Sequence, residues 1–167
     1  MQVIRQVRLV IRQQHRFLSS VIPCEGTIKQ YLPGQPYELK KGDDLHWKRV
    51  LTQEIINQFA NVICDFNPIH FDPSKGPTIA HGMLYGSMFS AMIGNYLPGT
   101  RYLKQTLEFS HPVPAGSEVE ATIRVNRMFP SKHIAILDTT VSLQNVPVST
   151  GQATIRQIGR ASCRERV

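Results

Sequence analysis

HGMLYGSMFSAMIGNY, residues 81–96, is the segment of the chain that says most about its architecture. Apolar side chains fall on almost every side of a helical projection of this segment, which is typical of a helix that is buried all round. Glycine, alanine and serine recur between the larger residues and would allow neighbouring backbone to approach closely. The turn sequence LPGT follows directly, so we expect the helix to end near residue 96.

The segments on either side of this helix define the rest of the fold. Residues 44–52 alternate apolar and polar side chains like a strand, and Thr52 can cap a helix over residues 53–64 with apolar residues at helical spacing. One buried helix followed by several antiparallel strands predicts an α+β fold in which the sheet wraps around the helix. The strand-like segments after it, separated by turn signals, are 102–109, 118–127, 134–144 and 148–156.

DFNPIH, residues 65–70, follows the predicted helix and is the first candidate for chemistry. Pro68 prevents the helix from continuing, so Asp65 and His70 can both point into one cavity from the same loop. A carboxylate beside an imidazole can donate one proton while accepting another, and Asn67 between them could hydrogen-bond either partner or orient a water molecule. The alternative is a polar turn with a structural role, and these six residues alone leave both interpretations open.

Gly82 lies in the first turn of the helix expected over residues 81–96, where backbone N–H groups lack partners and the helix dipole adds partial positive charge. Without a side chain at this position, a carbonyl oxygen could reach the backbone amide, which would form half of an oxyanion hole. Tight helix packing is the alternative reason for a glycine here, and the alternative role of His81 is that of a helix cap.

Four segments, CDFNPIH, IAHGML, LPG and LEFSHPVPAG, occur in this order and resemble the MaoC-like dehydratase and (R)-specific enoyl-thioester hydratase family of hot-dog fold proteins, over about residues 40–156. The resemblance implies that His70 removes the C2 proton of an (R)-3-hydroxyacyl thioester, while Asp65 helps the 3-hydroxyl leave as water. It implies that the Gly82 amide polarises the thioester carbonyl and that Asn67 orients His70 or the water. It also implies a homodimer paired through sheet edges and, because the thioester itself acidifies the C2 proton, no metal or redox cofactor.

The activity implied by this resemblance is that of a hydro-lyase that interconverts (R)-3-hydroxyacyl and trans-2-enoyl thioesters, with the acyl group carried by acyl carrier protein or coenzyme A. The alternatives on the same fold are an acyl-CoA thioesterase and a non-catalytic acyl-thioester binding protein. Two features depart from the family pattern. Cys64 stands where a glycine is usual, and only ten residues separate His70 from His81, fewer than in relatives, which bears on the preferred acyl chain length.

The two ends of the chain carry most of its charge. Of the net charge of +7, residues 1–20 contribute +4 and residues 158–167 contribute +2, so the centre is nearly neutral, which argues against nucleic-acid binding. Residues 1–20 form a basic amphipathic pattern without acids, which resembles a mitochondrial presequence and predicts the matrix as the location. A helix docked on the domain or on a membrane surface is the alternative. Residues 158–167, IGRASCRERV, resemble a translated sequencing adapter, so we interpret them as a non-native tail.

Between the two ends we expect a connector over residues 21–40, rich in proline and glycine, and a single domain over residues 41–157. No apolar run approaches the roughly 20 residues that are needed to span a bilayer, so we expect no integral membrane segment. Cys24 and Cys64, the cysteines outside the tail, form no pattern typical of a structural metal site or of a disulfide framework.

Overall fold

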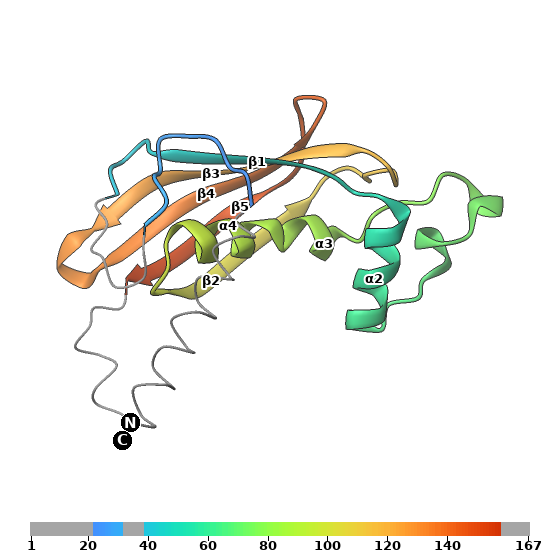
Figure 1. Cartoon of the computed structure of the whole chain (residues 1–167), viewed down its shortest axis with the longest axis horizontal. Helices are drawn as coiled ribbons and strands as arrows, with labels where there is room; N and C mark the ends of the chain where they lie inside the picture. The colour runs from blue at the N-terminus through green and yellow to red at the C-terminus, as the bar shows by residue number, and fades with distance from the viewer. Residues whose placement is uncertain (1–21, 32–38, 158–167) are drawn as a thin grey trace, which may run out of the picture.

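The computed structural model describes residues 22–31 and 39–157, which form a five-stranded antiparallel sheet with a helix along one face (Figure 1). The strands stand in the order β1-β3-β4-β5-β2. The predicted presequence and the predicted non-native tail lie outside the described residues. The bounds of the strands are Asp44–Val50 (β1), Thr100–Phe109 (β2), Glu118–Phe129 (β3), Ile134–Leu143 (β4) and Val146–Gln157 (β5).

Helices connect the first two strands. The α-helices are Gln53–Ile63 (α2), Gly82–Gly86 (α3) and Met88–Tyr96 (α4). Short 3₁₀ helices are Pro68–His70 (η2), Pro73–Lys75 (η3) and, between β3 and β4, Pro130–Lys132 (η4). Within the described part of the chain, no helix is long and apolar enough to cross a membrane.

Alternating burial defines the two faces of the sheet. The side chains between the buried positions are mostly polar and face away from the core, as expected for an antiparallel sheet with one solvated face. The four strands predicted after the central helix are confirmed, each within two residues of its expected bounds. The buried positions of β3 and β4 are Val119, Ala121, Ile123, Val125, Ala135, Leu137, Thr139 and Val141.

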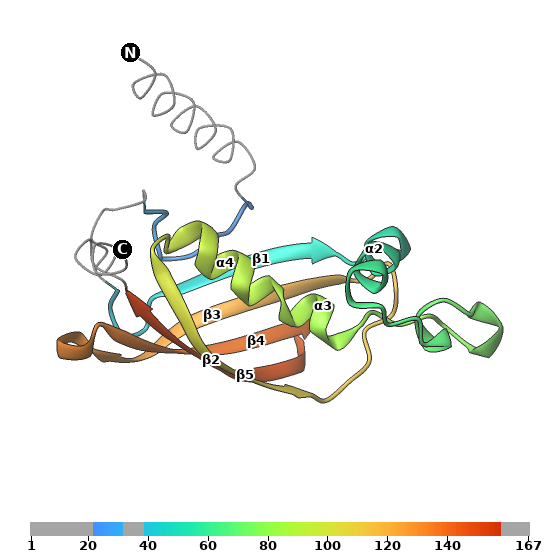
Figure 2. The same cartoon turned by 90° about the horizontal axis from the view of Figure 1, so that it is seen from below.

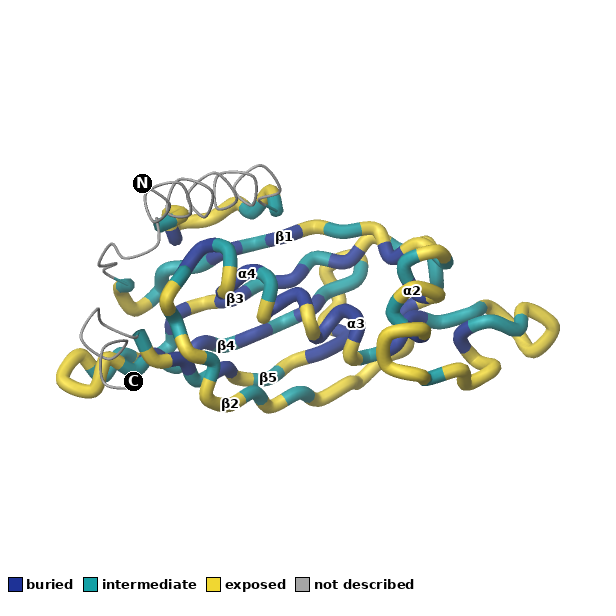
Figure 3. Tube along the Cα trace, turned by 60° about the horizontal axis from the view of Figure 1, so that its bottom comes forward, coloured by how far each residue is buried: buried dark blue, intermediate teal, exposed yellow. Residues whose placement is uncertain are grey.

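The central helix lies along the inner face of this sheet (Figure 2). Phe89 and Met92 are fully buried, as the sequence predicts. The helix is broken at Ser87, whose hydroxyl donates to the Leu84 carbonyl at 2.6 Å and so competes with the helical backbone bonds. The expectation of burial on every side is wrong, because a stripe at helical spacing is exposed to solvent (Figure 3). This stripe consists of Met83, Ser87, Ser90 and Gly94.

Helix α2 begins and ends as local sequence signals require. The Thr52 hydroxyl accepts a hydrogen bond from the Ile55 amide at 3.3 Å, which confirms the predicted N-cap. The helix ends at Ile63, and Cys64 after it has a backbone φ of 58° in the left-handed region. This residue turns the chain out of the helix and into the segment that begins with Asp65.

The two edges of the sheet differ in how far they are covered. Residues 22–31, within the predicted connector, run beside β1, where Glu25 and His46 exchange backbone hydrogen bonds of 2.9 and 2.6 Å. Ile28 of this segment is buried in the core. On the other side of the sheet, no strand among the described residues pairs with the outer edge of β2.

Candidate active site

The loop over residues 65–81 joins α2 to α3 and closes on itself. Near its two ends, the Ile79 amide donates to the Ile69 carbonyl at 3.1 Å. The ten residues between His70 and His81 are therefore enough to bring the end of DFNPIH back to the start of the central helix. The short link changes the length of the loop without separating the two candidate segments.

The side chain of Gln53, in the first turn of α2, hydrogen-bonds to two residues of this loop. Its Nε2 donates to the His70 carbonyl at 2.9 Å, and its Oε1 accepts from the Thr78 hydroxyl at 2.9 Å. One amide side chain thus holds residues on both halves of the loop. The position of His70 therefore depends on α2, a helix that is specified by its N-cap and by apolar residues at helical spacing.

The loop also fixes the tautomer of His70. The side chain is buried, and its Nδ1 lies 2.7 Å from the carbonyl oxygen of Ile79. Because a carbonyl oxygen only accepts hydrogen bonds, Nδ1 carries a proton, and in the neutral ring Nε2 then presents a free electron pair. Nε2 lies 3.9 Å from Oδ2 of Asp65. The imidazole is therefore oriented to accept a proton on the side that faces the carboxylate.

The two oxygens of Asp65 have different neighbours. Oδ1 accepts a hydrogen bond from the Asn67 backbone amide at 3.2 Å, while Oδ2 is turned toward His70. The side chain of Asn67 accepts from the Ile69 amide at 3.3 Å and begins η2. Among the described residues, no hydrogen bond joins this side chain to His70. A role for Asn67 in orienting His70 or a water stays a prediction.

His81 belongs to the same cluster, although the sequence suggested at most a helix cap. Its side chain makes no capping hydrogen bond. The buried ring stacks on that of His70, with 3.6 Å between the centroids and 24° between the planes. Its Nε2 lies 3.2 Å from the backbone oxygen of Asp65. The available sequence signal was the position of His81 directly before Gly82, at the end of a loop that has to close.

Gly82 is the first residue of α3 and lies against the ring of Phe109 at the end of β2. A Cβ at position 82 would lie 3.0 Å from that ring, so glycine alone avoids displacing it. Within the described part of the chain, no acceptor bonds the Gly82 amide, as expected in a first helical turn. Sequence reasoning missed Phe109, which also meets Tyr85 edge-on with centroids 5.6 Å apart.

Asp65, His70 and His81 form a group whose spacing could suit a metal ion, since their donor atoms lie within 4.8 Å of one another. Two observations count against a metal centre. The stacked imidazoles are nearly parallel, so their in-plane electron pairs do not converge on one point about 2 Å from each nitrogen, as zinc ligation requires. Nε2 of His81 also carries the proton that it donates to the Asp65 backbone oxygen. The arrangement fits proton transfer better than metal binding.

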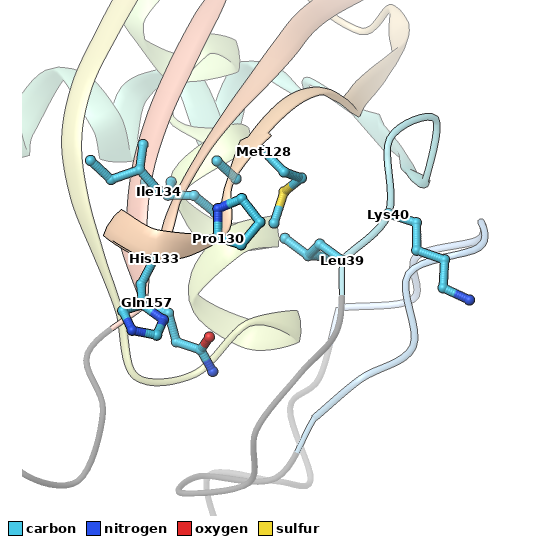
Figure 4. A pocket seen from close by; sticks show the side chains of 9 residues that line it. Leu39, Lys40, Met128, Pro130, His133, Ile134 and Gln157 are labelled. Atoms are coloured by element: carbon cyan, nitrogen blue, oxygen red, sulfur yellow. The ribbon is translucent and has the colours of Figure 1, made fainter.

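A cavity of about 440 Å³ lies at the other end of the sheet, beside η4 (Figure 4). None of its lining residues is acidic, so it offers an imidazole without a carboxylate partner. The candidate acid–base chemistry therefore belongs to the loop before α3 and not to this cavity. Its lining includes Leu39, Lys40, Met128, His133, Ile134 and Gln157.

Several known proteins are similar to this chain in sequence or in structure. Residues 29–146 match the model of the MaoC like domain. An (R)-specific enoyl-CoA hydratase from Aeromonas caviae is 40% identical over 107 residues, which cover 59% of this chain and 80% of that protein. A mitochondrial 3-hydroxyacyl-[acyl-carrier-protein] dehydratase from Arabidopsis thaliana is 41% identical over 87 residues, which cover 48% of this chain and 52% of that protein.

The solved structure of an (R)-hydratase from A. caviae superimposes on this chain with a TM-score of 0.70 at 33% sequence identity. The superposition covers 74% of this chain and 100% of that one, which confirms the hot-dog fold expected from the sequence. The matched family region contains Asp65, His70 and Gly82. The chain therefore belongs to the MaoC-like domain family.

Proposed function

We propose that this protein is a hydro-lyase that interconverts (R)-3-hydroxyacyl and trans-2-enoyl thioesters. The observation that carries the proposal is the buried ring of His70, whose free Nε2 lies 3.9 Å from the carboxylate of Asp65. The relatives from A. caviae and A. thaliana are named as a hydratase and a dehydratase of such thioesters, which supports the same reaction class.

Each group of the site has one task in the dehydration direction. Nε2 of His70 removes the proton from C2, and the electron pair moves toward the thioester carbonyl. The amide of Gly82 donates to the carbonyl oxygen and stabilises the enolate-like charge. Protonated Asp65 gives its proton to the C3 hydroxyl, so the C–O bond breaks and water leaves as the C2–C3 double bond forms. Hydration follows the same steps in reverse.

One turnover leaves a proton on His70 and a negative charge on Asp65. The two atoms lie 3.9 Å apart, so the proton can return to Oδ2 through a small movement or through one water. The pair therefore holds a single proton throughout the cycle. Because the thioester already acidifies the C2 proton, the reaction requires neither a metal nor a redox cofactor.

The acyl group is carried on acyl carrier protein or coenzyme A, and both present the same thioester to the site. The name of the A. thaliana relative supports the carrier protein and a place in mitochondrial fatty acid synthesis. Large apolar side chains of the loop after α2, of α3 and of the end of β2 are exposed and would suit an acyl chain. They are Phe66, Ile69, Met83 and Phe109.

We also propose a homodimer in which β2 of one protomer pairs with β2 of its partner. Residues 22–31 cover the outer edge of β1, whereas β2 has no partner on its outer edge within the described residues and exposes Leu103 and Phe109. An uncovered strand edge favours pairing with another chain. Light scattering at micromolar concentration should give the mass of a dimer, and a monomer would contradict this arrangement.

The proposed location is the mitochondrial matrix. The arginine-rich amphipathic pattern of residues 1–20 supports it, as does the mitochondrial dehydratase among the relatives. Residues 1–20 fused to a fluorescent protein should direct it into mitochondria, and diffuse fluorescence would count against the presequence.

The enzymatic proposal is tested by incubating the full chain with crotonyl-CoA and following the enoyl-thioester absorbance together with free thiol. We expect the absorbance to fall without thiol release, and (R)-3-hydroxybutyryl-CoA to restore it in the reverse reaction. Release of thiol would identify a thioesterase. Binding of the thioester without any turnover would identify a non-catalytic binding protein.

A further inference from the structure

We propose that His81 is a positioning residue of the active site, a neutral imidazole that holds both the Asp65 backbone and the ring of His70. This role rests on the proposed function, because it assigns His81 a task within the acid–base pair. The reaction described above needs no contact between His81 and the substrate, yet the residue is only 3% exposed. A polar ring buried this deeply at a catalytic loop calls for a physical reason.

The first observation is that the two imidazoles have opposite tautomers. His81 donates from Nε2 to the backbone oxygen of Asp65, 3.2 Å away, so its proton is on Nε2. His70 carries its proton on Nδ1, toward Ile79. Oδ2 of Asp65 therefore faces a free electron pair from His70 and an N–H from His81, each at 3.9 Å. The carboxylate therefore lies near one ring nitrogen that can accept a proton and one that carries a proton.

The second observation is the stacking of the two rings. The His70 and His81 centroids are 3.6 Å apart, while Phe59 and Phe71 lie at 5.5 and 6.3 Å from the His81 centroid. His81 is itself held between aromatic neighbours, so it is a rigid surface for His70. His70 cannot tilt away without losing both this stack and its hydrogen bond to Ile79. The position of its Nε2 relative to Asp65 is thus set by packing.

The third observation concerns the buried Nδ1 of His81 and the effect that a positive charge on this ring would have on His70. His70 becomes an imidazolium when it accepts the C2 proton, and a second positive charge on a ring 3.6 Å away would oppose that step. Nδ1 of His81 is buried and has no hydrogen-bond partner among the described residues. A proton added to Nδ1 would therefore find no hydrogen-bond acceptor among the described residues.

The tautomers can be measured directly in the full wild-type chain by NMR with ¹⁵N-labelled histidine near neutral pH. We expect the proton of His70 on Nδ1 and the proton of His81 on Nε2, with signals assigned by single substitution. A proton on Nδ1 of His81, or an imidazolium at that position, would overturn the proposal. This measurement does not depend on turnover, so it remains decisive even if the chain fails to hydrate enoyl thioesters, which would refute the proposed function alone.

Two substitutions separate the contacts of His81. His81→Phe keeps an aromatic face and loses the N–H, whereas His81→Gln keeps a donor and loses the ring. We expect each to lower kcat for crotonyl-CoA hydration by roughly tenfold to a hundredfold, with KM changed by less than about threefold, as for a misplaced catalytic group. His46→Gln, a substitution on the outer face of β1, serves as the control, and thermal unfolding verifies that each variant is folded.

Wild-type kcat in both His81 variants would overturn the proposal. So would a raised KM with unchanged kcat, because that result would mean that His81 binds the substrate and does not position His70. If a variant fails to fold, the NMR measurement on the wild-type chain still decides.

Discussion

Two imidazole–carboxylate clusters occur in this molecule, one in the loop before α3 and one on the outer face of β1. The surface cluster is the tighter one, since His46 lies 3.6 Å from Asp44 and 3.5 Å from Glu120, against 3.9 Å between His70 and Asp65. The side chain of His46 is 36% exposed, however, and that of His70 only 8%. Separation alone therefore does not identify an acid–base site.

The two clusters differ in the surroundings of their imidazole rings. Both nitrogens of His46 lie near a carboxylate, and Nδ1 is also 3.1 Å from the Thr122 hydroxyl, so neither nitrogen is left open to a substrate. His70 has Nδ1 closed by the Ile79 carbonyl and Nε2 open. The ring of His70 is shielded from solvent although its partner Asp65 is 46% exposed, whereas His46 and both of its carboxylate partners are partly exposed, so solvent and salt screen the interactions of His46.

The largest effect should come from the carboxylates of the two clusters. Asp65→Asn removes the group that gives its proton to the departing hydroxyl, and we expect kcat/KM for crotonyl-CoA hydration to fall about 10²- to 10⁴-fold. Glu120→Gln makes the matching change on the surface and should leave kcat/KM within about twofold of the wild type. Equal effects of the two substitutions would remove the distinction between the clusters.

A smaller effect is expected from closing the space beside the Gly82 amide. Gly82→Ala places a Cβ 3.0 Å from the Phe109 ring, so either the ring or the start of α3 has to move. We expect kcat/KM to fall by roughly tenfold to a hundredfold, since misplaced hydrogen-bond donors stabilise the transition state poorly. Gly94→Ala in α4 is the control, because a Cβ there meets nothing within 4 Å. A fully active Gly82→Ala enzyme would exclude this amide from catalysis.

Backbone strain at Cys64, next to Asp65, should be measurable through the free energy of unfolding. Cys64 has φ 58° directly before Asp65, in a region where a Cβ is unfavourable. Cys64→Gly should raise the free energy of unfolding in urea by about 1 kcal/mol. Cys64→Ala keeps the Cβ and should give no such gain. A destabilised Cys64→Gly variant would show that the thiol contributes more through its contacts than the backbone loses through strain.

The smallest effect concerns the surface cluster and its dependence on pH. The backbone amide of Thr27 holds the pKa of Asp44 below its ordinary value of 3.8, with smaller contributions from the Thr27 hydroxyl and His46. A depressed carboxylate pKa stabilises the fold above the unfolded value, and the stabilisation is lost as the pH falls through the folded value. Asp44→Asn should therefore lower the free energy of unfolding slightly between pH 5 and 8, and the difference should shrink below about pH 3.8. A difference that is independent of pH would rule out the charge as its cause.

Much of the fold could be predicted because its signals are local. Helical spacing and the Thr52 cap define α2, and alternating side chains define the strands. The exposed stripe of the central helix could not be predicted, because its exposure depends on which face of the helix the rest of the chain leaves uncovered. The helical segment itself does not contain that information. The break at Ser87 was also missed, since a hydroxyl that bonds the preceding turn is equally compatible with a continuous helix.

The residues of the candidate active site also differ in how far the sequence alone reveals them. Asp65 and His70 are recognisable because they lie within six residues, and Gly82 because it begins a helix. The contacts of His81 and Phe109 appear only when the loop closes and the end of β2 meets α3. The structure shows that the short link after His70 closes, because Nδ1 of His70 donates to the Ile79 carbonyl at 2.7 Å, while its effect on the preferred acyl chain length stays a prediction.

The most direct test of the pair formed by His70 and Asp65 is the kcat/KM of crotonyl-CoA hydration for His70→Gln and His46→Gln, measured side by side on variants with wild-type thermal stability. We expect His70→Gln to lose about 10²- to 10⁴-fold and His46→Gln to remain within about twofold of the wild type. Hydration that survives in His70→Gln, or an equal loss in His46→Gln, would contradict the assignment of the chemistry to the loop before α3.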